Sequence, residues 1–470
     1  MAISQNSDYV LLSLLIVNIF QLEKLQDMIK RNLALATAAS LCTAPVVLAE
    51  ESAQEADWGI AAVWRTANIP FDTKGSDTSV STFIPMMFFK NDYVFLDGTM
   101  AGAHLYKTDD KELELNAIAR MRFIDIPADE QNAVGGDTAD YGLQMRYNFD
   151  DAWHFDTELM TDGHNRYHAN FRLQGMLDYG DLELRPNVTL RYKDADFNTE
   201  YYGTYRGTTD SLSGGMDYAM GVDAKYHVVS NLYLVGATNI RMLDNQAYHS
   251  SVIKERFEGE VYFGFGFFNE KKKSTSKAKQ VRRDIGAKPY VRVAHGYASP
   301  SDMGDILTFN GKRDPYNNQV TSVFYGHPLT DELFGMPLDI YLSPGIAHHW
   351  SSEVQGSGTE FITLIKAYYT FNWPVKMRLG VGNGLSYIDN ITYIEQQEMD
   401  KKEKRASHLM NYIDISYDIS IGSIIGKPEL EELWLGYALH HRSAIFEASS
   451  QFGRIKGGSN YSTFYLQYHF

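Results

Sequence analysis

The chain has 470 residues, a formal net charge of −16 and a sequence pI of about 5.3. A nucleic-acid partner is not expected, because an acidic surface repels the phosphate backbone. No stretch after residue 50 offers the roughly 18–20 consecutive apolar residues that a membrane-spanning helix needs, which excludes a helical membrane protein. Aromatic residues make up 13 % of the chain, mostly tyrosine and phenylalanine, as in proteins with aromatic rings at a membrane surface.

The first 49 residues carry the pattern of an export signal. A basic pair, an apolar stretch and a small-residue cleavage site follow Met28 in order: Lys30 and Arg31, residues 33–41, and residues 47–49. We therefore expect a signal peptide within residues 1–49, with translation starting at Met28, and a single long signal from Met1 as the alternative. The only cysteine, Cys42, lies inside this segment, so the exported chain would contain no disulfide and no reactive thiol.

From Trp58 onward, apolar residues alternate with polar or small ones, which predicts β-strands with one face in each environment. Residues 217–228 show this most clearly. Their apolar row is Tyr218, Met220, Val222, Ala224, Tyr226 and Val228. Such segments are longer than most strands of soluble sheets and suit a tilted membrane crossing. The alternative is a soluble β-sandwich.

The last strand favours the membrane. One face of it carries Ser462, Phe464, Leu466, Tyr468 and the final residue, Phe470. Outer-membrane barrels characteristically end on a terminal aromatic residue with apolar residues at alternate positions. The sequence therefore predicts an all-β fold of transmembrane antiparallel β-barrels, exported to the outer membrane of a Gram-negative cell.

A basic segment divides the chain. Alternation is lost in residues 270–286, which we interpret as a linker between two barrels, with a long turn of one larger barrel as the alternative. Residues 58–269 contain ten to twelve candidate strands. Eight are expected after the linker, near 287–298, 318–328, 336–347, 359–373, 375–388, 408–420, 431–443 and 460–470. An eight-stranded barrel is filled by its own side chains and would not be an open pore.

Residues 58–269 contain four distinctive segments: the strand at 58–65, the Asn-Ile-Pro-Phe-Asp loop from Asn68, the strand at 83–89 and the segment 91–98. In these segments the N-terminal half resembles the MipA/OmpV family of outer-membrane proteins. The namesake of this family resembles a scaffold protein that links a lytic transglycosylase, which cleaves murein, to a murein synthase. The resemblance therefore implies a role in organising the cell envelope. The partners it implies are murein-processing enzymes, beside the lipid and lipopolysaccharide of the outer membrane.

Residues 287–470 are similar to lipid A deacylases of the PagL type. Those enzymes carry a His-x-Ser pair one strand before the end, which His441 and Ser443 match. The resemblance implies that Ser443 is the nucleophile and His441 its base. Where the family has its acid, residues 457–460 contain no carboxylate, and Glu447 in the preceding loop is the candidate substitute. Ala444 also stands where an amide side chain is expected.

Other clusters of polar residues give weaker signals. Residues 348–353 hold two histidines, two serines and a glutamate, but end the third strand of the second barrel. That strand lies across the barrel from the seventh, so we expect this cluster not to combine with the cluster at 439–443. His154, His164 and His168 lack the spacing of a metal site, so neither a metal nor a cofactor is predicted.

Three functions follow as hypotheses. The leading one is a non-enzymatic barrel protein that organises the envelope as a scaffold for murein synthesis and hydrolysis. The alternative is a lipid A ester hydrolase in the second barrel, so whether the chain is an enzyme stays open. The third is a passive channel through the first barrel.

Overall fold

The computed structural model describes residues 57–75, 77–134, 138–269, 284–445 and 447–470. The predicted signal region and residues 270–283 of the predicted linker lie outside this part of the chain. No helix within it is both long and apolar enough to cross a membrane.

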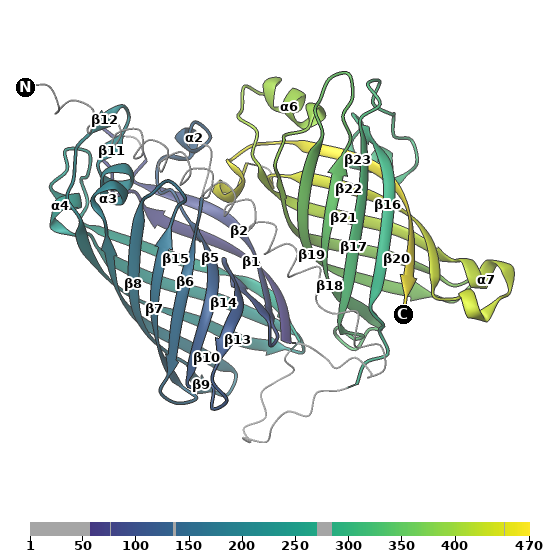
Figure 1. The fold of residues 1–470 in the computed structure, drawn as a ribbon, viewed down its shortest axis with the longest axis horizontal. Coiled ribbons are helices and arrows are strands. Elements are labelled where there is room, and N and C mark those ends of the chain that lie inside the picture. The colour runs from purple at the N-terminus through teal and green to yellow at the C-terminus, as the bar shows by residue number, and fades with distance from the viewer. Residues whose placement is uncertain (1–56, 76, 135–137, 270–283, 446) are drawn as a thin grey trace, which may run out of the picture. The chain divides into compact units, whose positions relative to one another are not determined.

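The N-terminal barrel is one antiparallel sheet that closes on itself (Figure 1). Its strands are β1 (Asp57–Asn68), β2 (Ser79–Lys90), β3 (Val94–Gly98), β4 (Met100–Lys107), β5 (Leu113–Arg122), β6 (Thr138–Asn148), β7 (Trp153–Thr161), β8 (Tyr167–Gly175), β9 (Leu177–Tyr179), β10 (Leu182–Lys193), β13 (Gly215–Val229), β14 (Leu232–Met242) and β15 (Phe257–Phe268). β1 pairs with β15 and β10 with β13, which closes the ring. The short β9 continues β8 along the same edge of β10, so the thirteen segments make a barrel of twelve strands. This number is within the range expected from the sequence.

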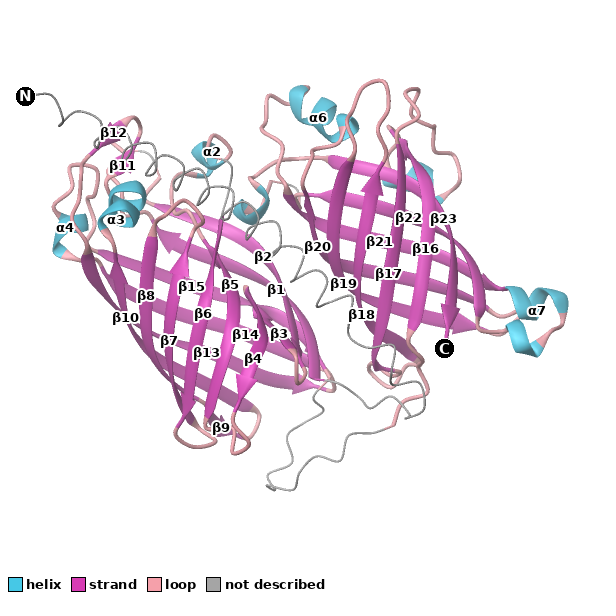
Figure 2. Ribbon diagram, in the orientation of Figure 1, coloured by secondary structure: helices cyan, strands magenta, loops and turns pink. Residues whose placement is uncertain are grey.

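The C-terminal barrel is a closed ring of eight strands (Figure 2). They are β16 (Tyr290–Ser299), β17 (Gln319–Thr330), β18 (Leu338–His349), β19 (Gly358–Phe371), β20 (Met377–Ile388), β21 (Leu409–Ser420), β22 (Leu433–Ser443) and β23 (Gly458–His469). The predicted eight-stranded barrel is confirmed, with each strand at its expected place in the chain. Two barrels, not one large barrel, are therefore built from this sequence.

The outer walls are apolar, as the alternation predicts. On β23, Phe464, Leu466 and Tyr468 are each about half exposed, whereas Tyr461 and Tyr465 on the opposite face are buried. On β15, Val261, Phe263 and Phe265 are likewise exposed. Closed barrels that satisfy every strand edge and present apolar rows outward are the β-architecture that spans a membrane. The protein is an outer-membrane β-barrel protein.

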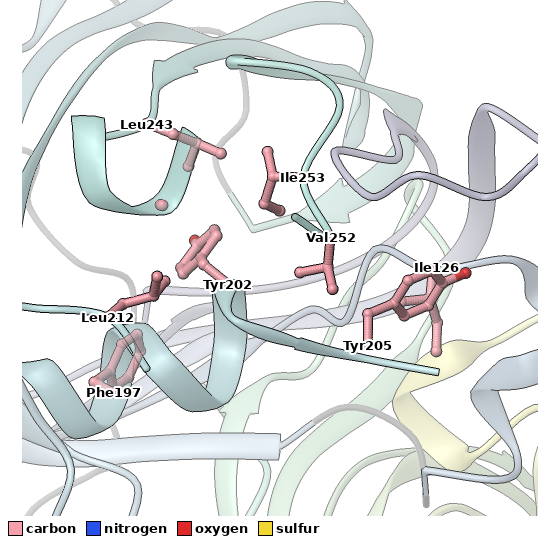
Figure 3. Close-up of a cluster of buried hydrophobic side chains, with 9 residues drawn as sticks. Ile126, Phe197, Tyr202, Tyr205, Leu212, Leu243, Val252 and Ile253 are labelled. Carbon is pink, nitrogen blue, oxygen red and sulfur yellow. The ribbon is translucent and has the colours of Figure 1, made fainter. Parts of the chain in front are cut away.

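One end of the N-terminal barrel carries all of its long connections. These are residues 69–78, 123–134, 194–214 and 243–256, with α2 (Ala128–Gln131), α3 (Ala195–Tyr202), β11 (Thr204–Tyr205), β12 (Thr208–Thr209) and α4 (Asn245–Tyr248). Their apolar side chains form one buried cluster (Figure 3), composed of Ile126, Phe197, Tyr202, Tyr205, Leu212, Leu243, Ala247, Val252 and Ile253. We call these packed connections the loop cap. Long loops mark the extracellular end of outer-membrane barrels, and short turns the periplasmic end.

The C-terminal barrel is filled by its own side chains, as an eight-stranded barrel should be. Tyr290, Tyr341 and Tyr368 pack edge to face near one end. The Arg292 guanidinium and the Lys366 ammonium both contact the Asp414 carboxylate in the interior. The longer connections, with α5 (Met303–Leu307), α6 (Tyr393–Asp400) and η2 (Ser450–Phe452), define the outer end, whereas α7 (Ile421–Ile425) and η1 (Pro428–Leu430) lie at the other end.

Candidate functional site at the outer end of β22

The outer end of β22 presents chemistry on both of its faces. His440 and Arg442 point into the barrel and are 2 % and 0 % exposed. His441 and Ser443 occupy the opposite face, in the same row as Leu435, which is exposed on the outer wall. Successive side chains of a strand point to opposite faces, so β22 contributes to two separate groups of polar residues, one inside the barrel and one outside.

On the outward face, an asparagine orients the imidazole of His441. Nδ1 of His441 lies 2.5 Å from Oδ1 of Asn460, its direct neighbour on β23. The Asn460 amide nitrogen donates to the carbonyl of Ser301 at 2.9 Å, which fixes the amide oxygen toward His441. The oxygen then accepts the Nδ1 proton, so Nε2 of the neutral ring carries the lone pair that a general base needs.

The structure brings together two of the three predicted catalytic residues. His441 and Ser443 share a face two residues apart on β22. Glu447 instead lies 3.9 Å from Lys404 in an ion pair, and its backbone N–H donates to Ile455. Among the described residues, no hydrogen bond joins His441 to Ser443 or to Glu447. The catalytic assignment stays a prediction, with Asn460 and not Glu447 beside the ring.

The sequence does not single out Asn460 as a site residue, although it lies within residues 457–460, where the acid is expected. Only strand register could have found it, since His441 and Asn460 are directly opposed in the β22–β23 ladder. An amide in this role has a precedent in the Cys-His-Asn arrangement of papain-like proteases.

On the inward face, a buried glutamate joins two histidines from opposite walls. Oε2 of Glu360 accepts hydrogen bonds from Nε2 of His349 at 2.8 Å and Nε2 of His440 at 2.9 Å. Oε1 accepts a hydrogen bond from the Ser386 hydroxyl at 2.5 Å. All four side chains are at most 2 % exposed.

Each imidazole is backed by a tyrosine. The Tyr461 hydroxyl lies 3.2 Å from Nδ1 of His349, and the Tyr412 hydroxyl lies 3.0 Å from Nδ1 of His440. We call His349, Glu360, Ser386, Tyr412, His440 and Tyr461 the Glu360 cluster. Both hydroxyls can donate to or accept from the ring, so they are compatible with the Nε2 protons that bond Glu360 and also with protons on Nδ1.

An ion pair lies next to the Glu360 cluster. Arg442 donates to Ser386 at 2.6 Å and to Glu395 of α6 at 3.0 Å. A terminal nitrogen of the same guanidinium lies 3.8 Å from Glu360. α6 thereby contributes a buried carboxylate at the outer end of the barrel.

The expectation that the histidines of 348–353 and of 439–443 would not combine is wrong. The rings of His349 and His440 lie 6.1 Å apart between centroids, bridged by Glu360. The interior of an eight-stranded barrel is narrow enough for long side chains on opposite walls to meet. The outward neighbours His348 and His441 do not take part.

Three histidines of the N-terminal barrel, for which the sequence predicts no metal site, lie beside separate acids. His154 lies 3.7 Å from Asp156, and His168 lies 3.0 Å from Asp140. The side chain of His164 is 74 % exposed in the β7–β8 loop. The three rings therefore have separate partners.

Comparison with known proteins gives outer-membrane barrels among the solved structures. Neisserial surface protein A has 12 % identity over 45 % of this chain and 96 % of its own length, with a TM-score of 0.19. OprB of Pseudomonas putida has 8 % identity over 88 % of this chain and 94 % of its own length, with a TM-score of 0.22. OccK8 (OprE) of Pseudomonas aeruginosa has 10 % identity over 89 % of this chain and 98 % of its own length, with a TM-score of 0.23.

No curated protein matches the chain. A family model does match it, over residues 67–268 and so over all of the strands from β2 to β15. That family is described as "MltA-interacting protein MipA". The N-terminal barrel of this protein is therefore similar to that family over the matched residues.

Proposed function

We propose that this outer-membrane protein organises the cell envelope by holding murein-processing enzymes at the periplasmic end of its N-terminal barrel. The observation that carries the proposal is the match of residues 67–268 to a family described by its interaction with MltA. A binding role also suits a barrel whose extracellular end bears a packed loop cap.

The short turns of the N-terminal barrel offer a surface for such a partner. They expose carboxylates at Asp92, Asp109, Asp110, Glu112, Asp150 and Asp151. An acidic surface attracts a partner with a basic patch and speeds the encounter at low salt. The proposed docking surface is therefore the turns that follow β2, β4 and β6.

Affinity capture of the full chain from Gram-negative envelopes, after mild cross-linking, tests the scaffold. Lytic transglycosylases and murein synthases should be enriched at low salt and depleted as salt is raised. The triple variant Asp109→Asn, Asp110→Asn, Asp150→Asn should capture several-fold less. A matched control, Asp77→Asn in the loop at the opposite end, should capture as much as the native chain. Absence of murein enzymes from every native capture would refute the scaffold.

A second candidate, a lipid A ester hydrolase, is favoured by one observation. Asn460 holds His441 in the tautomer whose Nε2 can take a proton from Ser443. In the proposed reaction, the Ser443 oxygen attacks the acyl carbonyl and its proton passes to Nε2. The imidazolium then protonates the departing sugar alkoxide, and water releases the fatty acid from the serine. The outward face at the outer end of β22 suits acyl chains of the outer leaflet.

Mass spectrometry of lipid A from cells with and without the protein tests the hydrolase. Expression of the native chain should release one ester-linked acyl chain, and Ser443→Ala should restore the full acylation pattern. Asn460→Ala should slow release by about 10²- to 10⁴-fold, as loss of an orienting group does. His348→Ala, on the outward face of β18, is the control and should leave release unchanged. An acylation pattern that is the same with and without the protein would refute this candidate.

A further inference from the structure

The interior of the C-terminal barrel holds a set of side chains that can bind a metal ion. One ligand atom from each of His349, Glu360 and His440 lies within 4.8 Å of the other two. The three residues are 1 %, 0 % and 2 % exposed, and come from β18, β19 and β22. We propose that these three side chains bind a divalent transition-metal ion of the zinc type.

The donor set is the first reason. Two imidazoles and one carboxylate are the protein ligands of one class of zinc site, and imidazole also suits other late first-row ions. The two Nε2 atoms lie 2.8 and 2.9 Å from Oε2 of Glu360. Ligands bound at about 2.0–2.1 Å in a tetrahedral site lie about 3.3 Å apart. Each nitrogen would therefore move away from Oε2 by about half an ångström, while the ligand atoms of the two histidines, which lie within 4.8 Å of each other, would close to that spacing.

The groups behind the ligands are the second reason. Histidines that bind metals usually donate their other ring N–H to an oxygen, which fixes the tautomer. The hydroxyls of Tyr461 and Tyr412 lie 3.2 and 3.0 Å from the two Nδ1 atoms and can accept these protons. With the ring protons on Nδ1, the two Nε2 lone pairs would bind the ion, in place of the Nε2–H hydrogen bonds that Glu360 accepts in this structure.

Local charge is the third reason. Glu360 and Glu395 are both fully buried carboxylates, and the guanidinium of Arg442 lies near both. Within these ion pairs, one cation is shared by two carboxylates. A divalent ion would add a counter-charge directly at Glu360, where a buried charge without a counter-charge is costly.

Metal content of the refolded full chain tests the proposal. Because the ligands are buried, the protein is unfolded in chelator, refolded in detergent with ZnCl₂ or without it, freed of loose metal and analysed by mass spectrometry. We expect about one zinc per chain, and with CoCl₂ the visible absorption bands of a four-coordinate cobalt site. Glu360→Gln and His440→Gln should each lose the bound metal and those bands.

The matched control is His348→Ala, which removes the outward neighbour of the proposed ligand His349 and should keep full metal content. Heat-modifiable electrophoretic migration establishes that each variant has closed its barrels. If Glu360→Gln does not fold, His349→Asn takes its place as a milder change. Native protein that refolds without stoichiometric metal overturns the proposal, as does a folded Glu360→Gln chain that retains it. Either result leaves the envelope and hydrolase proposals untouched, because their residues lie elsewhere.

Discussion

His440 and His441 are neighbours in the sequence and have opposite surroundings. His440 is buried and donates to Glu360, whereas His441 faces outward and bonds Asn460. The row of apolar residues from Leu433 to Leu439 predicts this difference, because every second residue of a strand shares a face. The sequence therefore predicts that His440 and His441 lie on opposite faces of β22.

The partners of these histidines could not. Glu360 is a single glutamate at the start of β19, and nothing local marks it as the acceptor for two rings on β18 and β22. Asn460 meets His441 only through the register of β22 against β23. Register depends on closure of the whole ring, which residue periodicity does not specify.

Arg442 offers a test of how much the buried ionic network stabilises the C-terminal barrel. Its side chain is 0 % exposed and donates to Glu395 and Ser386. Arg442→Ala would leave the Glu395 carboxylate buried without its cation, so the free energy of unfolding should fall by about 3–5 kcal/mol. Urea titration in detergent, followed by tyrosine and tryptophan fluorescence, measures the change.

The control for this change is Lys401→Ala, since the Lys401 side chain is 68 % exposed in an ion pair of α6. Surface pairs of this kind contribute at most about 1 kcal/mol. An Arg442→Ala chain as stable as Lys401→Ala would show that the network contributes little to stability.

At the scale of elements, the strands could be predicted and the loop cap could not. Apolar residues alternate along β13 and β23, because one face of each strand forms part of the apolar outer wall of its barrel. The cap has no such periodicity, because its buried apolar residues come from three connections far apart in the sequence. Its helices are short, and α3 begins where the Asp194 carboxylate accepts the N–H of Phe197. Only the assembled barrel brings these connections together.

Arg206 links three connections of the loop cap and gives it a pH dependence. The guanidinium pairs with Glu130 of α2 and donates to the carbonyl of Thr73 at 3.0 Å. The hydrogen bond from Arg206 holds the pKa of Glu130 below its ordinary value. A carboxylate with a lowered pKa stabilises the fold above its unfolded-state pKa, and that stabilisation is lost as the pH falls through the folded-state value.

We therefore expect the cap to loosen below about pH 4, near the ordinary pKa of glutamate. Hydrogen exchange of peptides from residues 194–214, corrected for intrinsic rates, should rise there relative to pH 7. The Glu130→Gln chain should show this faster exchange already at pH 7 and little further change on acidification. An equal response to acid in native and Glu130→Gln chains would contradict the role of this pair.

At the scale of the whole molecule, both barrels contain features that oppose an open pore. The C-terminal interior is occupied by buried tyrosines and by the ionic network around Asp414. In the N-terminal barrel, interior ion pairs cross between strands, with Arg120 and Glu158 at 2.7 Å and Arg146 and Asp156 at 2.7 Å. The loop cap adds a cluster of buried apolar side chains at the extracellular end.

Planar-bilayer recording of the full chain should accordingly show little steady conductance, although a barrel of twelve strands is wide enough to enclose a lumen.

The loop cap can be removed without changing a strand of the barrel wall. Replacing residues 196–212 with a short Gly-Ser turn deletes Phe197, Tyr202, Tyr205 and Leu212 from its buried cluster and should raise the conductance several-fold. A matched chain with the same Gly-Ser turn in place of residues 391–404, which carry α6 of the other barrel, should stay closed because the C-terminal interior is filled along its length. Large, stable openings of the native chain would instead establish the passive channel, and unchanged conductance after removal of 196–212 would show that the interior ion pairs alone keep the N-terminal barrel closed.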